Sequence, residues 1–131
     1  MSYDLSTVLH LFGGFLLFTS FGAMIYHQLH TGDAVSASRD KARRLAGASH
    51  GIALVILFAS GLLLVWHLTR IRVIDGYPWP LWVWLKMALW LLMGALIAII
   101  RRAPHLAKAL WWGVPLLGGV AAFLAIYKPG G

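Results

Sequence analysis

Four histidines occupy the same frame in two apolar segments of the chain, and histidine is the residue type here best suited to bind a cofactor. His10 and His27 are 17 residues apart, and so are His50 and His67, at an offset of 40 from the first pair. Neutral imidazole is a common axial ligand of haem iron. The pattern favours b-type haem as a cofactor, with His10 and His50, which lie deeper in their segments, as first candidates for iron ligands.

The spacing also predicts how two helices must place these side chains. A rise of 17 helical residues covers about 25 Å, close to the thickness of the hydrocarbon core of a membrane. In an antiparallel hairpin, a residue of the first helix lies at the same depth as the residue of the second helix for which the two numbers add up to a fixed total. The numbers of His10 and His67, and of His27 and His50, both add up to 77, which predicts one facing pair near each side of the membrane.

Helix geometry limits this interpretation and leaves a second one open. Adjacent helices pack about 8–10 Å apart, too close for a haem between them unless they splay or lie diagonally. Two histidines in this spacing point about 100° apart on an ideal helix, and the start of the second helix can shift the register. The alternative is that the histidines at the segment ends, His27 and His67 above all, are anchors in the headgroup region.

Lys86 is the one charged residue inside a predicted span, apart from Lys108 at the start of the last one. It follows Pro80 by six residues, so its stem can extend to the outer headgroups. The functional alternative is that its ammonium group binds a haem propionate or another anion.

The composition is typical of a membrane protein. Of the 131 residues, 60% are hydrophobic and 11% are charged, and the mean hydropathy is +0.79. Four apolar stretches are each long enough to span a bilayer: Leu5–Leu29, Leu45–Leu68, Trp79–Ile100 and Leu106–Tyr127. We expect one all-α domain over residues 1–131, an integral membrane four-helix bundle whose first two helices form an inverted-topology repeat.

Missing residue types exclude several kinds of chemistry. The chain has no cysteine, and its four acidic residues are all aspartates outside the middle of the spans. Disulfides, thiolate metal sites and a carboxylate proton relay are therefore not expected. No phosphate-binding loop or Ser-His-Asp set is present, so no catalytic residue is predicted, and an electron-transfer or accessory role is favoured over an enzyme.

The positive charges predict the topology. Lysines and arginines are concentrated after the first and third apolar stretches, at positions 39–44 and 101–108. The positive-inside rule places these loops in the cytoplasm and both termini outside, in the bacterial inner membrane. Because anionic headgroups already explain basic residues at helix ends, nucleic-acid binding is not expected.

Part of the second half resembles a helix of several small bacterial membrane families. The segment Trp82–Trp90 reads WVWLKMALW and is followed by Gly94 and a closing pair of arginines, and the chain ends near Ala125–Pro129, AIYKP. These features resemble SirB-like proteins, the membrane domain of CopD and HemJ-type protoporphyrinogen oxidases.

The resemblance to HemJ-type chains implies that His10 and Lys86 lie around a porphyrin. The chain departs from that family at Leu91–Gly94, where HemJ-type helices carry a later histidine. Its size and four-span layout are most similar to SirB-like proteins, for which the resemblance implies no particular chemistry.

Three functions agree with these patterns. The first is a haem b or porphyrin-associated membrane protein. The second is a cofactor-free accessory subunit, or homo-oligomer, that packs in the bilayer against a larger membrane complex, as the seven tryptophans and many small residues suggest. The third is a small transporter subunit, which ion flux in liposomes would reveal.

Overall fold

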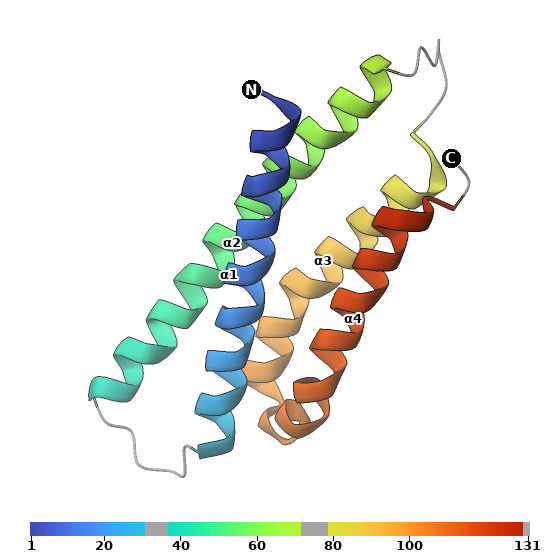
Figure 1. The fold of residues 1–131 in the computed structure, drawn as a ribbon. Coiled ribbons are helices and arrows are strands. Elements are labelled where there is room, and N and C mark those ends of the chain that lie inside the picture. Colours follow the sequence, from blue (N-terminus) through green and yellow to red (C-terminus); the bar gives the residue numbers. More distant parts are fainter. Residues whose placement is uncertain (31–36, 72–78, 130–131) are drawn as a thin grey trace.

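The computed structural model describes residues 1–30, 37–71 and 79–129, and all regular structure in them is helical. The helices are α1 (Tyr3–His30), α2 (Ala37–Ile71), α3 (Leu81–Arg102) and α4 (Ala107–Tyr127), with a short 3₁₀ turn, η1 (Pro104–Leu106), before the last (Figure 1). Each of the four long helices can cross a membrane by length and composition. The prediction of an all-α chain with four membrane-length helices is confirmed, and it indicates a multi-pass membrane protein.

The observed spans agree with the predicted ones except at their ends. The largest difference is in α2, which begins at Ala37, eight residues before the predicted span begins at Leu45. The helix extends beyond the apolar stretch because alanine, lysine and arginine are strong helix formers whatever their hydropathy. A hydropathy pattern therefore located the span but not the first turns of the helix.

The closest helix contact in the bundle joins α1 to α2. Gly13 is buried in this interface, and a Cβ atom built on it would lie 3.0 Å from Ile56 Cγ2 and 3.3 Å from the backbone nitrogen of Leu57. Small residues at such positions allow two backbones to approach closely, which is how membrane helices gain packing energy without a hydrophobic driving force. Gly13 therefore fixes the two helices at short separation.

Helix α1 makes the most extensive contacts in the bundle; α1 and α3 each contact all three other long helices. The buried residues Leu17, Phe21 and Met24 of α1 follow a helical spacing and belong to the same core as residues of α2, α3 and α4. A side-chain hydrogen bond ties α3 to α2, from Trp90 Nε1 to the carbonyl oxygen of Leu54, at 3.0 Å. These contacts hold the α3–α4 hairpin against the α1–α2 hairpin (Figure 1).

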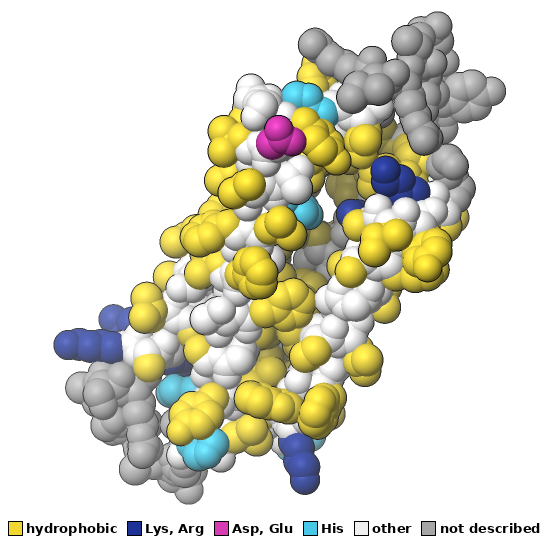
Figure 2. Space-filling view, in the orientation of Figure 1, with side chains coloured by type: hydrophobic (Ala, Val, Ile, Leu, Met, Phe, Trp, Pro, Cys, Tyr) yellow, Lys and Arg dark blue, Asp and Glu magenta, His cyan; other side chains and the backbone are white. Residues whose placement is uncertain are grey.

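The outer surface is apolar over the middle of the bundle. Figure 2 shows hydrophobic side chains across most of the visible face, with lysines and arginines toward its two ends. Phe15, Val55 and Trp112 are 72%, 67% and 73% exposed. An apolar belt of this extent matches a lipid environment.

Candidate functional site

Two histidines of the predicted site each meet a serine of the opposite helix. His10 Nδ1 lies 2.9 Å from Ser60 Oγ, and His50 Nδ1 lies 3.4 Å from Ser20 Oγ. Since His50 and Ser60 follow His10 and Ser20 by 40 residues, the two contacts are equivalent under the internal repeat. The α1–α2 pair thus has the same His–Ser contact twice: once with the histidine on α1 and the serine on α2, and once with the two exchanged.

The serines determine which ring nitrogen carries the proton. Ser60 Oγ donates its single hydrogen to the carbonyl oxygen of Ile56 at 2.6 Å, and Ser20 Oγ donates to that of Leu17 at 2.7 Å. A hydroxyl that gives its hydrogen to this carbonyl can only accept from the histidine, and this arrangement assigns the proton of a neutral ring to Nδ1. In that tautomer the lone pair is on Nε2, the nitrogen that a metal or a hydrogen-bond donor would use.

The surroundings of His50 leave its Nε2 atom without a protein partner. The side chain is only 2% exposed, and Nε2 is buried with no hydrogen bond to any described residue. Phe21 packs edge-on against the ring at a centroid distance of 4.7 Å. Because buried polar atoms in native proteins are nearly always paired, such an orphan points to a ligand or a water molecule.

Helix α3 brings one cation to each histidine. Lys86, half-buried with its ammonium group 5.5 Å above the ring of Trp82, is within electrostatic range of His10. Near its other end, α3 brings Arg101 within range of His50. We call His10, Ser60 and Lys86 the His10 set.

The equivalent group at the other end of the bundle comprises His50, Ser20 and Arg101, and we call it the His50 set. In both groups a serine orients the imidazole and a cation can neutralise an anionic ligand. The His10 set is the more accessible of the two, since His10 is half-buried whereas His50 is enclosed.

The structure does not bring the predicted histidine pairs to one depth. The numbers of the contacting residues add up to 70 in both His–Ser pairs, rather than to 77. His67 therefore lies seven residues beyond the level of His10, and His27 lies seven beyond that of His50. Each offset corresponds to about 10 Å along the helix axis.

The hydrogen bonds of His67 also differ from those of a ligand. Its Nε2–H donates to the carbonyl oxygen of Met1 at 3.0 Å, and the ring meets Tyr3 edge-on. This contact ties the N-terminal residue Met1 to α2. His27 is half-buried near the end of α1.

The residues present fit one axial imidazole per haem and not two. The two histidines of each predicted facing pair are offset along the helix axis. The close approach of the helices at Gly13 also leaves no space for a tetrapyrrole between α1 and α2. The described residues also hold no group of three or more metal-binding side chains. A porphyrin would have to approach from the side of α3 and α4, where Figure 2 shows a hollow between the two hairpins with a histidine and basic side chains at its edge.

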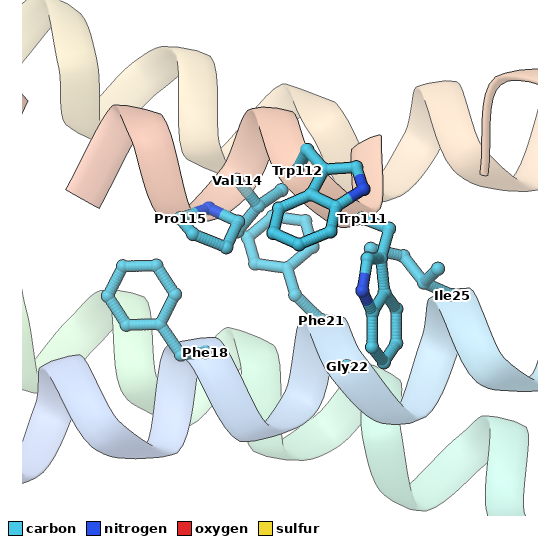
Figure 3. Close-up of a pocket in the computed structure, with 8 residues that line it drawn as sticks. All are labelled: Phe18, Phe21, Gly22, Ile25, Trp111, Trp112, Val114 and Pro115. Atoms are coloured by element: carbon cyan, nitrogen blue, oxygen red, sulfur yellow. The ribbon is translucent and has the colours of Figure 1, made fainter. Parts of the chain in front are cut away.

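A second, apolar pocket lies between α1 and α4 (Figure 3). Its volume is about 240 Å³, and Phe18, Phe21, Trp111 and Trp112 contribute aromatic rings to its lining. Because Phe21 also contacts His50, the pocket adjoins the His50 set through one ring. Typical small-molecule sites measure about 300–1,000 Å³, so this pocket would have to widen to admit a tetrapyrrole.

The sequence singles out no histidine partner among Ser20, Ser60 and Arg101. Their residue types and positions predict that the two serines form hydrogen bonds between helices, and that Arg101 either anchors its helix at the membrane surface or binds an anion there. Both serines do lie between helices, but they also orient a histidine each. The sequence does contain a signal for this role. The residue numbers add up to the same total in both His–Ser pairs, and the 40-residue repeat relates one pair to the other.

Comparisons with known proteins add no assignment. No protein-family model matches the chain, and no curated protein or solved structure is similar to it. The site must therefore be interpreted from its own geometry.

Proposed function

We propose that the chain is a multi-pass bacterial inner-membrane protein that binds haem b or a related porphyrin through His10 and His50. The observation that carries the proposal is the hydrogen bonding of the two imidazoles. Each Nδ1 atom lies within hydrogen-bond distance of a serine hydroxyl that also contacts a backbone carbonyl, an arrangement that assigns the proton to Nδ1 and leaves Nε2 for a ligand. Metal-binding histidines are typically held in this way, because a hydrogen bond at one nitrogen orients the other toward the metal.

The cations support the same proposal. A haem or porphyrin carries carboxylates, and a charge-assisted hydrogen bond from an ammonium or guanidinium group is among the stronger polar contacts in proteins. Lys86 is in electrostatic range of His10, and Arg101 is in range of His50. Haem, when bound, would supply one-electron redox chemistry. The protein would contribute one histidine to bind the iron and one cation to bind the haem carboxylates.

The test is the colour of the protein. Purified from haem-replete cells, it should give a reduced-minus-oxidised spectrum with sharp bands in the b-haem region. Titration of colourless protein with haemin and with iron-free porphyrin separates binding through iron from binding through the carboxylates alone. A chain that stays colourless in cells and binds neither compound would contradict the proposal.

A cofactor-free accessory subunit is the second candidate, and one observation favours it. The two His–Ser contacts join α1 to α2 and serve helix packing even without a ligand. In that case the exposed apolar faces, which include Trp112 and Ile126 at 73% and 74%, would contact a membrane partner. Negative results in both titrations, together with co-purification of one defined membrane protein, would select this function.

The proposed topology gives an independent prediction. A reporter fused after Gly131 should be active outside the cytoplasm, and one inserted at Ser36 should be active inside. The reason is that lysines and arginines are concentrated in the first and third loops. Fusions to a phosphatase and to a fluorescent protein measure this directly. A cytoplasmic signal at Gly131 would reverse the sides of both histidine sets.

A further inference from the structure

A strongly basic hollow lies where α2 and α3 meet, at the end of the bundle that we expect in the cytoplasm. It has a volume of about 270 Å³ and is lined by Asp40, Arg43, Arg44 and Arg101. Three guanidinium groups against one carboxylate leave two uncompensated positive charges. We propose that this hollow binds the phosphate of an anionic phospholipid headgroup.

The hollow is built by the fold rather than by chance proximity of surface charges. Arg101 reaches across from α3 to α2, where a Cβ atom on Gly47 would lie 2.5 Å from its Nη2 atom. A side chain at this position would displace the guanidinium group from its place against α2. Arginine donates planar, paired hydrogen bonds that match phosphate oxygens, so the arrangement is selective for phosphate over a simple anion.

The position of the hollow along the helices indicates a lipid rather than a soluble phosphate. Asp40 and Arg101 lie at the ends of two helices that are long and apolar enough to cross a membrane. The hollow therefore lies at the level where the headgroups of a bilayer would lie. Arg101 also belongs to the His50 set, but Arg43 and Arg44 belong to neither histidine set, so the inference does not depend on porphyrin binding.

The experiment measures lipid selectivity in the full chain reconstituted into phosphatidylcholine vesicles. Spin-labelled phosphatidic acid, phosphatidylglycerol and phosphatidylcholine report the relative association of each lipid with the protein. We expect preference for both anionic lipids, and a loss of about ten-fold in that preference in Arg44→Gln or Arg101→Gln, the size expected for one lost hydrogen bond to a charged group. Arg44→Gln leaves the Gly47 contact intact, so it tests the site even if Arg101→Gln fails to fold.

Arg102→Gln is the matched control, since it removes the same charge from an exposed residue outside the hollow. It should change the preference by less than about three-fold, because Arg102 does not line the hollow and contributes only a long-range attraction that salt screens. An equal loss in Arg102→Gln, or no preference over phosphatidylcholine, would overturn the proposal. Displacement of the labelled lipid by inorganic phosphate at constant ionic strength would also overturn it, because the ligand would then be soluble phosphate.

Discussion

Replacing His10 and His50 together with alanine should abolish tetrapyrrole binding, whereas each single replacement should remove one of two sites. An iron with one protein ligand loses its whole axial contact when that imidazole is removed, so the loss at each site should be near complete rather than graded. The haem content per chain, measured from the reduced-minus-oxidised spectrum, reports the result.

The controls are the two histidines that the structure places away from these sites. His67 donates Nε2–H to the carbonyl oxygen of Met1, so His67→Ala should keep the full haem content, and so should His27→Ala. Ser60→Ala should weaken binding only at the His10 set, because the imidazole remains but loses its orienting acceptor. If His67→Ala removes as much haem as His10→Ala does, the two residues share one iron and the assignment of single ligands is wrong.

The largest effect on stability is expected from Gly13→Leu. A side chain at this position collides with Ile56 and with the backbone of Leu57, and a backbone can move away only if the helices separate. Overpacking of this kind typically costs about 1–3 kcal/mol. Unfolding of the reconstituted or detergent-solubilised protein by denaturing detergent, followed by circular dichroism, measures the change in the free energy of unfolding.

Gly14→Leu is the matched control for this variant. The two glycines are adjacent in α1, but a Cβ atom on Gly14 meets nothing within 4 Å. The gain in helix propensity is the same at both positions, so the difference between the variants isolates the packing contact. Equal stabilities would mean that α1 and α2 are not held at close separation, and the His–Ser contacts would lose their structural basis.

Much of the architecture was predictable because it depends on local properties of the chain. The length of an apolar stretch and the charges at its ends are visible in the sequence, and they located the ends of all four membrane-length helices to within eight residues. The 40-residue repeat is equally visible in the sequence, and together with their depth in the spans it singles out His10 and His50 as candidate ligands.

Only the tertiary structure decided which side chains meet. The depth of a residue on α1 relative to α2 depends on where the two helices touch most closely, and that is a contact between residues distant in sequence. Gly13 packs against Leu57, and with that contact in place His10 lies level with Ser60 rather than with His67. Hydrophobic periodicity is nearly unchanged when one apolar helix slides along another, so the pattern does not fix the register. Close packing at a single glycine does.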